Sequence, residues 1–281
     1  KLKNLTKNEE IFKFFLYFEF SKFFQKQFNL DYSQEFTLEP YLWNFEEFNE
    51  FILKWDDFER ALGTEGLKSA LVGLDSTEKT LLHKLSASQF DELFLPFLDK
   101  IFKLLNKSEI IGLLGSGDES ILMFVSRMRN RLNVELFWNT TEKFLSKDEL
   151  KKLLIVENKS SLTALQFATW NKDPESFIFI KKIYLSFFTT SEIQEILCNI
   201  KEDQMSFVSN IIEDSSIETA QEVAKFLGEL FVNEKLKLRE ILNHRNFNGF
   251  TVFNWFKDKK YEEKLTVFVG LLSGTFDKNE N

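Results

Sequence analysis

Hydrophobic residues along the chain gather into three recurring kinds of segment that are typical of helices. The first kind is long and strongly apolar, as in residues 90–105, 174–188 and 217–232. The second kind is short, with charged residues that lead into two aliphatic residues. The third kind begins with two apolar residues directly after a Ser or Thr. In a chain with only 10 Gly and 3 Pro among 281 residues, these segments predict an all-α protein rather than a turn-rich β-sandwich or barrel.

The Ser or Thr that precedes an apolar pair recurs at nearly equal distances along the chain. The five copies are Thr80, Ser120, Thr163, Ser206 and Thr251. Successive copies are 40, 43, 43 and 45 residues apart. In every copy the first, second and fifth residues after the hydroxyl residue are apolar, which places them on one side of a helix. We therefore expect each hydroxyl residue to be an N-cap, whose side-chain oxygen accepts a hydrogen bond from a free amide of the first helical turn.

A second motif keeps the same spacing upstream of each hydroxyl residue. Its copies are "GLKSALVGL" (66–74), "KSEIIGLL" (107–114), "SKDELKKLL" (146–154), "TSEIQEIL" (190–197) and "NEKLKLREIL" (233–242). Each unit then contains about three helices, none of which can bury its apolar face alone. Stacked units would share one continuous core, so the sequence predicts an α-solenoid of about five repeats of 40–45 residues.

We expect the repeat array to occupy residues 66–281. Residues 1–65 form a Phe-rich, helical N-terminal region that is either a cap for the array or a degenerate repeat. Thr37 lies 43 residues before Thr80, but Glu39 interrupts its apolar pair. The chain begins without Met, which favours a fragment of a longer polypeptide.

Three segments resemble ankyrin repeats: "TLLHKLSAS" (80–88), "LTALQFATWNKDPESF" (162–177) and "NFNGFTVFNWFKDKKYEEKL" (246–265). The family pattern has a Gly turn and a Thr cap, which Gly249 and Thr251 match, and a Leu-His pair, which Leu82 and His83 match. Its small apolar positions are matched by Ala164, Leu165 and Ala168. The units here are longer than the roughly 33 residues of an ankyrin repeat and lack its Pro, and their length equally suits armadillo or HEAT repeats.

The resemblance implies a non-catalytic protein-interaction module, because such solenoids bind partners along the first helix of each repeat and the loop before it. The positions three and seven residues after the cap vary widely among the copies, as a heterogeneous binding face would. The candidate partner-binding residues are His83, Met123, Arg127, Gln166, Trp170 and Asn254. Structural alternatives are a hydrogen bond within the fold for His83 and a packing contact with the next repeat for Trp170.

Charge and chemistry narrow the class of partner. A net charge of −8 disfavours a nucleic-acid groove and favours a protein with a basic or apolar surface, a second copy of the chain among them. The basic run "RMRNR" (127–131) is either a solvated helix end or a patch for something acidic. No cofactor-binding or metal-ligand motif is present, so we expect neither a cofactor nor a metal.

Two other functions remain open from the sequence. One is an enzyme with a non-obvious helical active site. The other is a membrane-peripheral module that uses residues 8–28, although the basic polar face that such a helix needs is weak. The single cysteine, Cys198, lies in an apolar helical run and indicates a buried thiol in a reducing compartment, so we expect an intracellular, cytoplasmic location.

Overall fold

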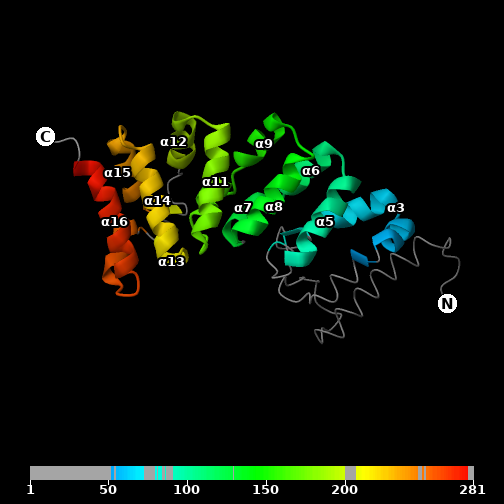
Figure 1. The fold of residues 1–281 in the computed structure, drawn as a ribbon, viewed down its shortest axis with the longest axis horizontal. Coiled ribbons are helices and arrows are strands. Elements are labelled where there is room, and N and C mark those ends of the chain that lie inside the picture. Colours follow the sequence, from blue (N-terminus) through cyan, green and yellow to red (C-terminus); the bar gives the residue numbers. More distant parts are fainter. Residues whose placement is uncertain are drawn as a thin grey trace. The chain divides into compact units, whose positions relative to one another are not determined.

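The computed structural model of the chain describes residues 52–53, 55–72, 80, 82–83, 86, 91–128, 130–199, 207–245, 249 and 251–277. Within these residues every regular element is a helix and no strand is present, so the predicted all-α class is confirmed for this part of the chain (Figure 1). The chain divides into two compact units, Lys1–Asn106 and Lys107–Asn281. No described helix is both long and apolar enough to cross a membrane.

The first unit contains helices α3 (Trp55–Val72) and α5 (Asp91–Leu104), which contact each other. Helix α3 is interrupted at Gly63, whose φ of 68° is a left-handed conformation that glycine adopts without the cost of a Cβ. The Trp55 ring packs edge-on against Phe97, with their centroids 6.0 Å apart. The predicted division after residue 65 falls inside α3 and stays a prediction, as does the interpretation of residues 1–50, which lie outside the described residues.

The second unit repeats three kinds of helix in a fixed order. The short helices are α6 (Lys107–Leu114), α9 (Lys147–Leu154), α12 (Thr190–Cys198) and α15 (Lys235–Asn243). The first helices, which follow the hydroxyl residues, are α7 (Ile121–Met128), α10 (Ala164–Ala168), α13 (Phe207–Asp214) and the 3-10 helix η1 (Val252–Lys257). The long helices are α8 (Arg131–Glu142), α11 (Pro174–Phe187), α14 (Ile217–Leu230) and α16 (Glu262–Asp277). All three predicted kinds of segment are therefore helical.

Several helices of the second unit contact the helix of the same kind in the next set. The long helices pack in succession, α8 against α11, α11 against α14 and α14 against α16. Among the first helices α7 contacts α10 and α13 contacts η1, and among the short helices α6 contacts α9 and α12 contacts α15. In Figure 1 the sets follow one another in chain order through the second unit.

Hydrogen bonds between the sets join residues about one unit length apart in the sequence. The Lys159 amide donates to Asp118 across 41 residues, and the Asn171 side chain donates to the carbonyl of Ser126 across 45 residues. The Lys151 ammonium donates to Glu192 at 3.0 Å, again across 41 residues. These polar contacts join one set of helices to the next.

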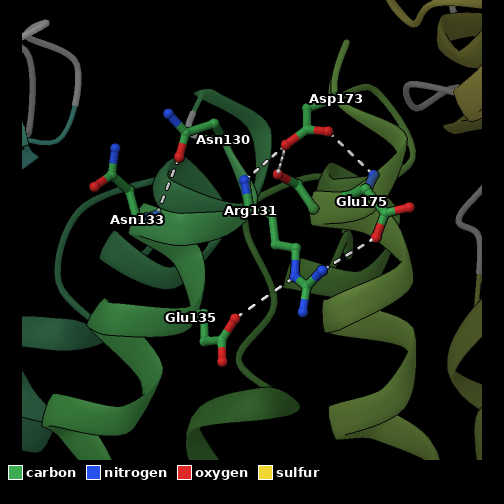
Figure 2. Close-up of polar contacts among 7 residues, drawn as sticks. Asn130, Arg131, Asn133, Glu135, Asp173 and Glu175 are labelled. Carbon is green, nitrogen blue, oxygen red and sulfur yellow. Dashed lines mark hydrogen bonds and ion pairs between the residues drawn. The ribbon is translucent and has the colours of Figure 1, made fainter.

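The N-termini of α8 and α11 are joined by the network that Figure 2 shows. Asp173 is the N-cap of α11, where it accepts from the amide of Glu175, and it also accepts from the amide of Arg131 at 2.6 Å. That amide is one of the free donors at the start of α8. The Arg131 guanidinium lies between Glu135 on its own helix and Glu175 on α11, each 3.5 Å away. One aspartate thus caps two helices from successive sets.

Tyr184 ties a long helix to the two helices that precede it. Its buried hydroxyl donates to the carbonyl of Leu154 at the end of α9 and accepts from the amide of Leu165 in α10, at 2.5 and 3.2 Å. Burial raises the pKa of Tyr184 far above its usual value, so the hydroxyl keeps its proton.

The sequence predicts a buried thiol at Cys198, but in the structure this residue is only half-buried. Desolvation raises the pKa of its thiol.

The short helices α9 and α12 begin with reciprocal capping boxes. The amide of Ser146 donates to Glu149 and the amide of Thr189 donates to Glu192, at 2.6 and 2.7 Å. The amide and hydroxyl of Thr189, together with the Lys151 ammonium, lower the pKa of Glu192 from 4.5 to about 2. The ionised carboxylate therefore caps the N-terminus of α12 and also holds α12 to α9.

Replacing Glu192 with Gln should remove the part of the acid-induced loss of stability that comes from protonating this carboxylate. Because folding lowers the pKa of Glu192, its carboxylate stabilises the folded state fully above about pH 4.5 and loses this effect as the pH falls toward 2. The difference in thermal unfolding midpoint between wild type and E192Q should be constant from neutral pH down to about 5 and should shrink below 4.5. The control E195Q, at an exposed carboxylate on the same helix, should follow wild type; a difference that persists unchanged at the lowest pH would contradict the capping role.

Replacing Asp173 with Ala should remove both caps at once. We expect D173A to lower the free energy of unfolding in urea by about 1–2 kcal/mol, and D173N to recover part of this loss because Asn is also a good N-cap. The control D148A removes an exposed carboxylate from the first turn of α9 and should cost no more than about 0.5 kcal/mol. Equal effects of D173A and D148A would show that neither cap bond of Asp173 stabilises the fold.

Candidate interaction surface

Four of the six predicted partner-binding residues are helix-capping residues. In each case the backbone amide of the hydroxyl residue donates to the side chain three residues later. The acceptors are His83 Nδ1 at 3.0 Å, Met123 Sδ at 3.4 Å, Gln166 Oε1 at 2.7 Å and Asn254 Oδ1 at 2.7 Å. This bond fills the place that the carboxylate of Glu149 or Glu192 has in the short helices. The varied side chains at this position therefore share one structural task.

The hydroxyl groups themselves take two different roles. Ser120 accepts from the amide of Met123 at 3.3 Å, which is the N-cap bond predicted from the sequence. Thr163 and Thr251 instead donate their hydroxyls to the side chains of Gln166 and Asn254. The copy at Ser206 lies outside the described residues.

The predicted exposure of this face is wrong for most of the candidate residues. His83, Met123 and Gln166 are at most 1% exposed, and Trp170 is 3% exposed. All five residues of α10 are buried, because its neighbours α7 and α11 cover it on two sides. This short helix has no side left for solvent, so α10 belongs to the core rather than to a binding face.

The structure brings Arg127 and Trp170 together around one ring. The Arg127 guanidinium lies 5.5 Å from the ring centroid of Phe167 and 5.4 Å from the ring centroid of Phe124. Phe124 is 43 residues before Phe167 in the sequence. Trp170 packs against the same Phe167, with centroids 4.7 Å apart. Arg127 also forms a 2.9 Å ion pair with Glu119 and is partly exposed. These two residues join successive sets of helices.

The basic run 127–131 is largely neutralised within the fold. Arg127 pairs with Glu119, and Arg131 lies between Glu135 and Glu175. Each guanidinium that the structure describes in this run therefore already has a carboxylate partner. This arrangement favours the solvated helix end over a patch for an acidic ligand.

Helices α8 and α11 each carry large apolar side chains that are exposed or partly exposed to solvent. We call this set, Leu132, Leu136, Ile178, Phe179 and Leu185, the α8–α11 surface. Leu132 is 63% exposed and Leu185 is 49% exposed, and the two helices pack side by side. Scattered apolar residues are ordinary on protein surfaces, but a group on two adjacent helices is a candidate contact region.

Two of the corresponding positions on α14 are polar. Leu136 and Phe179 are 43 residues apart, and Glu222 follows after another 43 residues. All three side chains are partly exposed to solvent. Likewise Ile178 corresponds to Gln221 on α14. A long helix at this place in the fold thus tolerates polar residues, so packing within the chain does not require the apolar ones on α8 and α11.

The sequence contains a signal for some of the capping residues that is separate from the repeat spacing. A Ser or Thr followed three residues later by Glu or Gln is a capping-box pattern, which Ser146, Thr189 and Thr163 all begin. It would have assigned Gln166 to the fold rather than to a partner. The His83 and Met123 versions use acceptors outside that pattern and required the structure.

Comparisons with protein-family models, curated proteins and solved structures found no match to this chain. Within the described ranges, no group of three or more His, Cys, Asp or Glu residues is placed to hold a metal ion.

The contact between Arg127 and Phe167 should appear as an energetic coupling between two sets of helices. In a double-mutant cycle of R127Q and F167L, measured by urea unfolding, we expect a coupling free energy of about 0.5–1 kcal/mol. The matched cycle of R127Q with F226L on α14 should be additive to within about 0.5 kcal/mol, since Phe226 packs instead against Phe177. Additivity in both cycles would show that the guanidinium does not stabilise the junction.

Proposed function

We propose that the chain is a helical-repeat solenoid that acts as a non-catalytic protein-interaction module inside the cell. The repeated order of short, first and long helices supports this architecture, as do the contacts between counterpart helices. Hydrogen bonds that recur across 41–45 residues give further support, because a regular stack would join equivalent places in successive repeats. The ankyrin-like segments remain a resemblance in sequence.

The observation that carries the function is the apolar character of the α8–α11 surface. Leu136 and Phe179 occupy a position where the next long helix has Glu222, and the fold is complete with that glutamate in place. Large aliphatic and aromatic side chains at partly exposed positions that the fold does not need are typical of a contact with another protein. We therefore propose the long helices, rather than the first helices, as the binding face.

The partner that fits this surface is a protein segment with an apolar side, such as one face of an amphipathic helix. Burying Leu132 and Leu185 beneath such a segment would remove two largely exposed side chains from water. The net charge of −8 would attract basic residues that flank the apolar ones, through long-range electrostatic steering. Binding would then weaken modestly with salt but would depend chiefly on the apolar contact.

The double variant L132E/L185E should abolish specific partner binding while leaving the fold intact. Both side chains are exposed, so charging them should disturb the core little, whereas a carboxylate within an apolar contact remains without a counterion. The measurement is capture from an extract of the native source, quantified by mass spectrometry, followed by binding of the recovered partner in purified form. We expect at least a tenfold loss of affinity, which corresponds to about 1.4 kcal/mol.

The matched control is T190E/S191E, which adds the same two charges at exposed positions of α12. It should bind the partner as wild type does, and circular dichroism should show the same helix content for all three proteins. A purified partner that binds L132E/L185E as tightly as wild type would overturn the assignment of the surface. A partner set lost equally in both double variants would indicate a charge effect rather than a contact.

A further inference from the structure

Lys182 is an exposed lysine of α11 whose neighbours on the helix are mostly residues of the α8–α11 surface. On an α-helix the nearest neighbours of a side chain are the residues three and four positions away. For Lys182 three of these residues, Ile178, Phe179 and Leu185, belong to the α8–α11 surface. The fourth is the exposed Ser186. None of them is acidic, and among the described residues no carboxylate pairs with Lys182.

The equivalent lysine of the next long helix does have a carboxylate partner. Lys225 of α14 lies 43 residues after Lys182, and its ammonium pairs with Glu222 on the same helix at 2.6 Å. Glu222 in turn lies 43 residues after Phe179. Both helices therefore have a lysine at the same place, but on α11 a phenylalanine replaces the carboxylate that pairs with it.

We propose that the partner of the α8–α11 surface brings an acidic side chain to Lys182, within an otherwise apolar contact. This inference rests on the proposed function, because it describes the chemistry of the same surface. The occupant is an amphipathic helix of another protein, with large apolar residues on the face that it buries and one Asp or Glu among them. That carboxylate would take the place that Glu222 has beside Lys225.

The free-energy cost of covering a lysine explains why the partner needs this carboxylate. A helix that packs on Phe179 and Leu185 would remove part of the Lys182 side chain from water. The methylene stem of the lysine can pack against apolar residues, but burying its ammonium is unfavourable unless the charge is paired. A carboxylate opposite Lys182 offsets this cost, whereas an apolar or basic residue does not. Lys182 would therefore select among amphipathic helices rather than strengthen the binding of all of them.

Helical peptides provide a direct test of this selection. The probes are amphipathic peptides of 14 residues, the length of α11, with a fixed apolar face of Leu and Phe residues. One position at the centre of that face is varied. A displayed library of this design, selected on the full wild-type chain, should enrich Asp and Glu at the varied position. Selection on K182E should enrich Lys and Arg there instead.

Three synthetic peptides with Glu, Gln or Lys at the central position give the affinities, measured by fluorescence anisotropy. Wild type should bind the Glu peptide at least about tenfold more tightly than the Lys peptide, and K182E should reverse this order. The matched control K225E makes the same change of charge at the equivalent lysine of α14, so it should keep the wild-type order. Circular dichroism should show the same helix content for all the proteins.

The possible outcomes separate this inference from the proposed function. L132E, on α8, changes the apolar surface without changing Lys182 and should weaken the binding of all three peptides. If wild type binds the three peptides equally and L132E weakens them, the acidic partner is overturned while the proposed surface is supported. If no peptide binds wild type more tightly than L132E, the proposed function is overturned and this inference with it. A preference that K225E changes as much as K182E does would indicate long-range attraction rather than a pair at Lys182, and would also overturn the inference.

Discussion

The structure depends on capping the N-termini of very short helices with side-chain hydrogen-bond acceptors. Helix α10 has five residues, α7 and α13 have eight, and α12 has nine, lengths at which an isolated helix is not stable in water. Each such helix begins with free backbone amides that are costly to bury without an acceptor. Side chains three residues on supply these acceptors at Thr80, Ser120, Thr163 and Thr251. These bonds therefore offset part of the free-energy cost of burying the first helices.

Burial of the first helices determines where binding can occur. Because α10 has no exposed residue, the side chains that vary from copy to copy there are constrained by capping and packing. Arg127 and Trp170, which have the chemistry of interface residues, meet at Phe167 within the chain. We propose instead that a partner binds the exposed and partly exposed apolar residues of α8 and α11.

Successive sets of helices are held together by polar as well as apolar contacts. Asp173 caps the N-termini of both α11 and α8. Glu192 caps α12 and also pairs with Lys151 on α9. These carboxylates combine a local task with a connection to the neighbouring set, so a cap and an inter-set contact are lost together.

The amino-acid sequence by itself determined the helical class, the three kinds of helix and their order, because apolar spacing and hydroxyl caps are local properties of the chain. It also contained the capping-box pattern at Ser146, Thr163 and Thr189. Only the tertiary structure decided which side of each helix is covered. A five-residue helix has no amphipathic period from which to infer a solvent face, so the burial of Gln166 and Trp170 depends on α7 and α11 packing around them. Leu136 and Phe179 are likewise residue types that are usually found in the core. Only the structure shows that they are partly exposed to solvent.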